Sequence, residues 1–206
     1  DNTYHYLNEI PFADHGALID PPTSDVTARC VGFLGKYGKQ HHQHAVLRGI
    51  SFLLQEQESS GAWFGRWGTN YIYGTWSVLE ALQLAKFDMQ HTSVCRAVKW
   101  LNSVQRADGG WGETNDSYLD DKLAGQFSET STAFQTAWAV LGLMAAGEVN
   151  SESVRKGISY LRRNQSSDHL WEDPCFTAPG FPRVFYLRYH GYSKFFPIWA
   201  LARYRR

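Results

Sequence analysis

The chain has 206 residues, which is enough for one domain with a sizeable core. Its 20 basic and 20 acidic residues give a formal net charge of zero, which argues against nucleic acid as a partner and against polybasic attachment to anionic lipid. The three scattered cysteines fit neither a disulfide framework nor a metal site, and no apolar run approaches the roughly 18 residues of a membrane span.

Aromatic residues are unusually frequent. The chain contains 8 Trp, 11 Tyr and 12 Phe, although Leu, Ile and Val fill a core without a buried N–H group to satisfy. This excess indicates a repeated structural use of aromatic rings, a ligand that prefers aromatic faces, or both.

The first residues, Asp1-Asn2-Thr3, include no initiator Met. The basic start and apolar stretch of a signal peptide are also missing, so no secretory leader is expected. We therefore expect the sequence to be a truncated chain.

A first helix is expected over Asp25 to Leu34, and three helix pairs follow it. In each pair an amphipathic helix ends in a turn and precedes a more apolar helix. The three apolar helices are predicted over Tyr73 to Ala85, Thr132 to Ala146 and Phe196 to Tyr204.

The amphipathic helices carry a motif that recurs three times. Each copy reads basic, small, two residues, aromatic, aliphatic, three residues, Gln, and then a turn that leads to Trp. The glutamines are Gln57, Gln105 and Gln165, and the tryptophans are Trp63, Trp111 and Trp171. A Gln side-chain amide can bond free backbone groups at a neighbouring helix end, and the Trp ring can stack on it. We interpret the motif as a fastener between adjacent helices rather than as catalytic chemistry.

These elements predict an all-α fold of about seven helices: one inner helix and then three outer–inner pairs. Pairs that alternate in this way and close on themselves make an α/α barrel, or toroid, of about six pairs. The chain would supply a little over half of such a ring, so the barrel is expected to be incomplete. Residues 1–206 are taken as the C-terminal part of the catalytic barrel domain, with the N-terminal half absent.

Three segments carry a resemblance to a known family. They are DPPTSDVTA at 20–28, WFGRWGTNYIYG at 63–74 and GFPRVFYLRYHGY at 180–192. Together with the Gln and Trp repeats, and in this order and spacing, they resemble the triterpene cyclases, and specifically the bacterial squalene–hopene cyclases. The resemblance covers essentially the whole chain.

The resemblance implies an isomerase of hopanoid biosynthesis that converts squalene into hopene, or into hopanol after water capture. The resemblance implies no metal or organic cofactor. It also implies a monotopic enzyme on the cytoplasmic face of a membrane, held there by parts of the protein missing from this chain. A homodimer is compatible with the resemblance. The family protonates a terminal alkene with an Asp from an Asp-x-Asp-Asp motif. This sequence has no such motif, since Asp120-Asp121 lacks the pattern. We therefore expect the isolated fragment to be inactive.

Asp25 and Arg29 are the residues that the resemblance places beside the absent acid. A cationic partner strengthens a carboxylic acid by stabilising its conjugate base. Well-known members carry His at the position of Arg29; Arg can still favour the carboxylate but cannot accept a proton. The alternative is an ordinary helix N-cap and surface pair, because the two residues are four apart on a helix.

Aromatic side chains suit the cyclisation that follows protonation of the alkene, because their faces attract carbocations without readily reacting with them. By resemblance, Trp67 and Tyr189 line the region of first ring formation, Phe181 and Phe185 lie by the later rings, and Tyr73 and Tyr192 support the wall. Phe12 matches the segment that narrows the substrate entrance. On a helix or a tight turn, Phe181 and Phe185 would have adjacent rings. Taken singly, each of these aromatic residues could equally be core filler.

The sequence is also compatible with two other functions. An α/α-barrel glycosidase would stack sugars on Trp and Tyr and use paired carboxylates, for which Glu113, Glu172 and Asp173 are candidates. A helical-repeat module could instead bind a lipid or prenyl group on an apolar concave face. The histidines His41, His42 and His44 have a spacing more typical of a solvated turn than of a metal site.

Overall fold

The computed structural model describes residues 21–126 and 130–205. Seven α-helices lie within these ranges, as predicted: α2 (Ser24–Tyr37), α3 (Gln43–Gln55), α4 (Tyr71–Leu84), α5 (Thr92–Ser103), α6 (Ala133–Ala145), α7 (Glu152–Arg163) and α8 (Tyr192–Tyr204). The same residues form three short 3₁₀ helices, η2 (Gln40–His42), η3 (Asn115–Tyr118) and η4 (Asp121–Leu123), and two short strands, β1 (Ala178–Phe181) and β2 (Phe185–Leu187).

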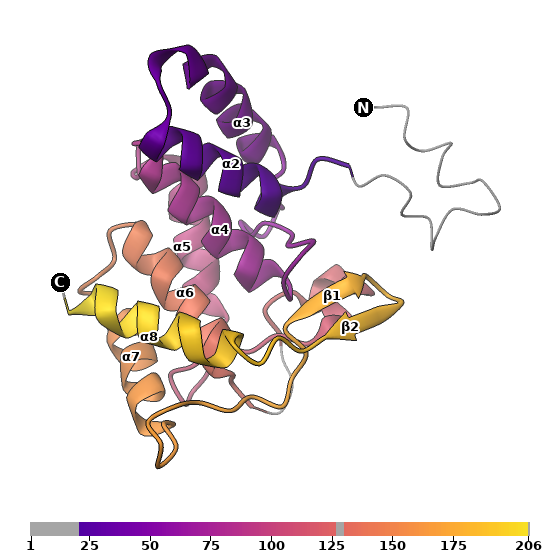
Figure 1. Cartoon of the computed structure of the whole chain (residues 1–206), viewed down its shortest axis with the longest axis vertical. Coiled ribbons are helices and arrows are strands. Elements are labelled where there is room, and N and C mark those ends of the chain that lie inside the picture. Colours follow the sequence, from indigo (N-terminus) through magenta and orange to yellow (C-terminus); the bar gives the residue numbers. More distant parts are fainter. Residues whose placement is uncertain (1–20, 127–129, 206) are drawn as a thin grey trace.

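The helices form two layers of an arc. Helices α2, α4, α6 and α8 lie side by side as an inner row, and α3, α5 and α7 pack outside them (Figure 1). Burial explains the assignment: α6 is buried over all of its residues, whereas α7 buries only the face that carries residues such as Val154, Ile158 and Leu161. The arrangement confirms the incomplete α/α barrel predicted from the alternation of outer and inner helices.

The Gln and Trp repeats fasten neighbouring pairs, as predicted. The side-chain amide of Gln57 donates to the carbonyls of Gly61 and Ser93, both at 2.8 Å, and Ser93 lies in the first turn of the next outer helix, α5. Gln105 donates in the same way to Gly109 and to Ser153 in α7, both at 2.9 Å. One side chain therefore joins its own turn to the following repeat.

The indole of each motif makes a different bond. Its Nε1–H donates to the carbonyl of a leucine ten residues earlier, at the end of its own outer helix, over 2.6 to 2.8 Å. Since the last carbonyls of a helix have no partner within the helix, the buried indoles satisfy one of them in each repeat. The pairs are Trp63 with Leu53, Trp111 with Leu101 and Trp171 with Leu161.

The third motif departs from the first two at its turn. Gly61 and Gly109 have positive φ, and a Cβ added there would lie 2.7 or 2.9 Å from a carbonyl oxygen of the next outer helix. His169, with φ of 62°, holds the same position in the third copy. The side chain is tolerated because, within the described residues, no further outer helix packs against this turn.

The C-terminal aromatic segment forms an antiparallel β-hairpin, which the predicted all-helical pattern did not contain. Ala178 pairs with Leu187, and Phe181 pairs with Phe185. The hairpin lies beside the N-terminal ends of the inner helices (Figure 1). Helix α8 starts at Tyr192, four residues before the predicted start, because the rings of Tyr192 and Phe196 both pack on Trp138 of α6.

Within residues 21–126 and 130–205, no helix combines the length and apolar character that crossing a bilayer requires.

Candidate active-site wall

Eight of the nine candidate site residues fall within the described part of the chain; Phe12 lies outside it. The eight come from α2, the loop before α4, α4 itself, the hairpin, the loop between β2 and α8, and the start of α8.

Arg29 of α2 lies over aromatic rings of α4. Its guanidinium carbon is 4.4 Å from the ring centroid of Trp76 and 5.8 Å from that of Tyr73, and one of its terminal nitrogens is 3.4 Å from Ser77 Oγ. These contacts place the permanent positive charge of Arg29 against the rings of α4. No carboxylate among the described residues forms an ion pair with Arg29.

Asp25 does not pair with Arg29. The side chain of Asp25 is fully buried, and its carboxylate accepts hydrogen bonds from Thr23 Oγ1 at 2.6 Å, Val26 N at 3.0 Å and Trp67 N at 2.7 Å. The N-cap of α2 is Thr23, without a side-chain capping bond, so Asp25 is not the N-cap that the sequence allowed. Its bond to Trp67 is a long-range contact that the sequence did not reveal. Asp25 holds the backbone of the loop that carries Trp67.

Tyr73, Tyr189 and Tyr192 belong to one continuous set of rings built around Trp138. The centroid of the Trp138 ring is 5.0 Å from that of Tyr73 and 5.9 Å from that of Tyr192, and Tyr192 lies 5.1 Å from Tyr189. Burial raises the pKa of Tyr73, and the charge of Arg29 opposes this rise in part. The hydroxyl therefore stays protonated near neutral pH.

Trp67 presents one covered face and one partly free one. The guanidinium carbon of Arg66 lies 4.2 Å from the centroid of its ring, while 40% of the residue remains exposed. Arg66 itself is buried, and its Nη1 is 3.4 Å from the carbonyl oxygen of Gly180 in β1. A carbocation would have to approach the face of Trp67 that Arg66 leaves open.

Phe181 and Phe185 face each other across the hairpin. Their ring centroids are 5.4 Å apart in an edge-to-face arrangement, so the predicted adjacency is confirmed, with a tight turn rather than a helix as its cause. Phe185 is 43% exposed and Tyr189 47% exposed. The described residues therefore form one side of a candidate site, and these two rings are open to solvent on the other side.

The carboxylates proposed for a glycosidase serve another purpose. Glu113 accepts hydrogen bonds from the backbone N–H groups of Asn70, Tyr71 and Ile72 at the start of α4, over 3.1 to 3.4 Å. Its complete burial raises the pKa of Glu113, and the bonds from the backbone offset part of that rise. Such a carboxylate satisfies helix donors that would otherwise be unpaired.

Asp173 repeats this arrangement one unit later. It stands two residues after Trp171, as Glu113 does after Trp111, and it accepts from Ala133 N at 3.0 Å and Phe134 N at 3.3 Å at the start of α6. The second and third repeats thus cap the inner helix of the preceding repeat, whereas Gly65 holds the equivalent position in the first repeat. With two of the three candidate carboxylates used as caps, the glycosidase alternative is not favoured.

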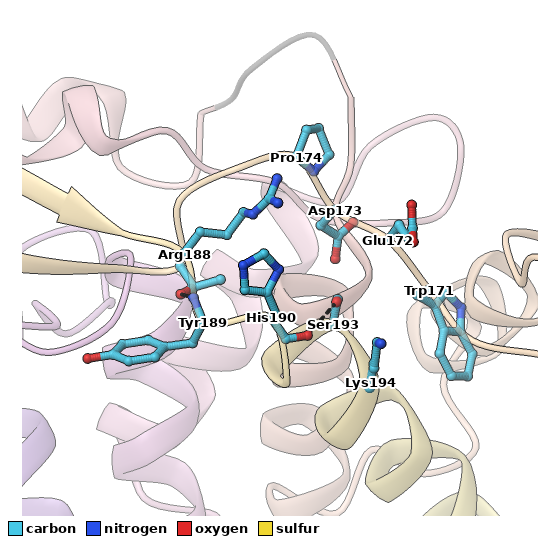
Figure 2. A pocket seen from close by; sticks show the side chains of 10 residues that line it. Trp171, Glu172, Asp173, Pro174, Arg188, Tyr189, His190, Ser193 and Lys194 are labelled. Atoms are coloured by element: carbon cyan, nitrogen blue, oxygen red, sulfur yellow. Dashed lines mark hydrogen bonds between the residues drawn. The ribbon is translucent and has the colours of Figure 1, made fainter.

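A polar cavity of about 310 Å³ lies beside this cap (Figure 2). The side chains of Arg188, His190 and Asp173 project toward its middle, whereas the ring of Tyr189 extends away from it (Figure 2). The charged lining does not suit an apolar ligand. We therefore place the candidate site on the aromatic wall and not in this cavity.

Several residues of the wall escaped sequence reasoning. Trp76 and Trp138 are fully buried and stack at 6.0 Å, forming the base on which Arg29, Tyr73 and Tyr192 rest. Their only sequence signal was the apolar face of a predicted inner helix.

Comparisons with known proteins identify the family of this chain. The family model described as squalene-hopene cyclase C-terminal domain matches residues 1–206. The squalene–hopene cyclase of Zymomonas mobilis is 57% identical over 205 residues, and that of Bradyrhizobium diazoefficiens is 55% identical over 208 residues; each match covers 100% of this chain and 31% of the relative. The chain therefore spans about a third of the length of these relatives.

A solved structure supports the fold. The ent-copalyl diphosphate synthase of Streptomyces platensis superposes with a TM-score of 0.69 at 19% identity, over 91% of this chain and 34% of that one. At this identity the likeness concerns the fold alone. The match of the family model along the whole sequence, with the fastened helix pairs, shows that this chain belongs to the squalene–hopene cyclase C-terminal domain family.

Proposed function

We propose that the longer protein containing this chain is a squalene–hopene cyclase, an isomerase that converts squalene into hopene, or into hopanol when water captures the last cation. This chain would supply an aromatic wall for the growing cation. The observation that carries the proposal is the continuous set of rings from Tyr73 through Trp138 to Tyr192 and Tyr189, with Trp67 and the Phe181–Phe185 pair at the same end of the arc.

The chemistry requires an acid, a dry cavity and cation-stabilising faces. A proton adds to a terminal alkene, the resulting cation is attacked by successive double bonds, and the reaction ends with loss of a proton or addition of water. Aromatic faces stabilise each cation without trapping it. We assign the proton donor to an Asp outside this chain and give Arg29 the role of favouring its carboxylate form.

The substrate class supports a membrane location. An unsubstituted C30 hydrocarbon partitions strongly into a bilayer, so an enzyme that acts on it gains from contact with the membrane surface. We propose monotopic association on the cytoplasmic face through other parts of the longer protein, with a homodimer as the assembly to test.

The experiment is a chimaera. The matching 205 residues of the Zymomonas mobilis cyclase are replaced by this chain, which is 57% identical. The chimaera is incubated with squalene, and the products are separated by gas chromatography with mass detection. Pentacyclic hopene or hopanol is expected, whereas this chain alone should give none.

A folded chimaera that binds squalene but makes no cyclic product, beside an active parent enzyme, would contradict the proposal. Folding is checked by circular dichroism and by the midpoint of thermal unfolding. Binding of squalene without turnover would favour the lipid-binding alternative.

A further inference from the structure

Tyr118 contacts the loop that carries Trp67. It is the last residue of η3 and is almost completely buried. Its hydroxyl oxygen lies 2.8 Å from the carbonyl oxygens of both Gly65 and Gly68. The single hydroxyl hydrogen is shared between these two carbonyls, which flank Arg66 and Trp67.

The same residue also contacts the hairpin that carries Phe181 and Phe185. The backbone carbonyl of Tyr118 accepts a 2.8 Å hydrogen bond from Nε of Arg183, which lies in the hairpin turn. The Tyr118 ring stacks on that of Tyr186 in β2, with centroids 6.0 Å apart. Two segments more than a hundred residues apart in sequence therefore meet on one buried side chain.

The loop and the hairpin also contact each other directly. Thr69 N donates to the carbonyl of Thr177 at 3.0 Å, and Arg66 approaches Gly180 at 3.4 Å. Neither contact holds the carbonyls of Gly65 and Gly68, which lie on buried residues and accept from Tyr118.

We propose that Tyr118 is a positioning residue: it fixes the distance between Trp67 and the Phe181–Phe185 pair, and so determines how completely the chain of ring closures proceeds. This inference rests on the proposed function. Trp67 is assigned to the first ring and the phenylalanines to the later rings, so their separation sets whether one substrate conformation can contact both.

The physical basis is the steep dependence of such contacts on geometry. Buried carbonyls that lose their donor draw in water or shift, and the loop then moves relative to the hairpin. A displacement of about 1 Å can cost about a hundredfold in rate when reacting groups must be aligned. Burial also raises the pKa of Tyr118 far above its usual range, so the hydroxyl remains a donor at every pH at which the enzyme would work.

Tyr118→Phe in the chimaera is the decisive variant, because it removes one oxygen and keeps the ring. Tyr160→Phe is its matched control. The hydroxyl of the buried Tyr160 on the outer helix α7 also donates to a loop carbonyl, that of Ser131 at 2.6 Å, but Ser131 belongs neither to the Trp67 loop nor to the hairpin. Both variants lose the same kind of bond, and only Tyr118 bonds to the loop that carries Trp67.

For Tyr118→Phe we expect kcat to fall about tenfold with KM changed less than about twofold, and the share of incompletely cyclised products to rise. Tyr160→Phe should lower the unfolding midpoint and leave the product ratio unchanged. An identical product ratio in Tyr118→Phe and the unsubstituted chimaera would overturn the inference while leaving the proposed function intact.

Arg183→Met provides a second variant should Tyr118→Phe fail to fold. It keeps an apolar stem and removes the guanidinium, including the Nε donor to the Tyr118 carbonyl. A rise in the same incompletely cyclised products is expected, and an unchanged ratio would overturn the inference. Loss of all products from the unsubstituted, folded chimaera would instead count against the proposed function.

Discussion

Trp67 N donates a 2.7 Å hydrogen bond to Oδ2 of Asp25, which lies 42 residues earlier on α2. The same carboxylate accepts hydrogen bonds from Val26 N and from the hydroxyl of Thr23 at the start of its own helix. The start of α2 and the loop that presents the Trp67 ring are therefore fixed by one buried charged group. This relationship assigns Asp25 a physical task that does not depend on a direct contact with substrate.

We predict that Asp25→Asn destabilises the protein by about 1–3 kcal/mol, because the amide nitrogen cannot accept the bonds that the second carboxylate oxygen accepts. Turnover should fall as the Trp67 loop loosens. Thermal unfolding and product assays of the chimaera measure both effects. Asp88→Asn is the control, since Asp88 is exposed and its carboxylate accepts from Gln90 N, two residues away.

Arg29→Ala should lower turnover sharply if Arg29 supports the proton donor, and Arg29→His should retain much of it, because a protonated imidazole also favours a carboxylate. If Arg29 is only a surface residue, alanine should cost less than about 1 kcal/mol of stability and leave the rate unchanged. Lys36→Ala on the same helix is the control, since Lys36 likewise lies over a ring, that of Tyr37. Equal rates for the unsubstituted chimaera and Arg29→Ala would exclude the catalytic role.

Glu113→Gln should destabilise the protein by about 1–3 kcal/mol, because both carboxylate oxygens accept from the start of α4 and an amide can offer only one acceptor oxygen. Glu172→Gln is the matched control: Glu172 is an exposed neighbour of the equivalent cap, Asp173. Equal unfolding midpoints for the two variants would show that Glu113 is not a significant cap.

Gly109→Ala tests the close approach between repeats. Gly109 has φ of 88° and packs against the carbonyl of Lys156, whereas Gly147 has φ of 91° with nothing within 4 Å of an added Cβ. Both alanine variants incur the strain of positive φ, about 1 kcal/mol, and only Gly109→Ala adds the clash. The difference between their unfolding free energies measures the cost of the clash between the added Cβ and the Lys156 carbonyl. Equal unfolding free energies would argue against a rigid contact between these repeats.

The helices were predictable from sequence, because each inner helix is apolar over several turns and each outer helix is followed at the same distance by the Gln of the motif. The β-hairpin was not. The four-residue spacing of Phe181 and Phe185 fits a helix or a turn equally well, and the pairing of Ala178 with Leu187 depends on contacts that no local pattern encodes.

The candidate site was predictable only in part. Resemblance indicated the exposed rings, but the residues that hold them act through distant partners. Tyr118 reaches Gly65 across 53 positions, and Glu113 reaches Tyr71 across 42. A carboxylate in a loop after a Trp therefore looked like a catalytic candidate, although the helix that it caps lies in the preceding repeat.

Phe181→Ala and Phe185→Ala should change what is made more than whether substrate binds. A desolvated ring contributes about 2 kcal/mol to a nearby cation, or roughly thirtyfold in partitioning, and an aliphatic side chain offers no comparable quadrupole. We expect Phe181→Ala to yield products with fewer rings, and Phe185→Ala to do so at a similar or later stage. Phe185→Tyr should retain late products. If the two phenylalanines only pack, their replacement by alanine should lower stability and reduce all products in proportion. An unchanged product ratio at reduced yield, measured by gas chromatography, would therefore remove the support for cation stabilisation by this pair.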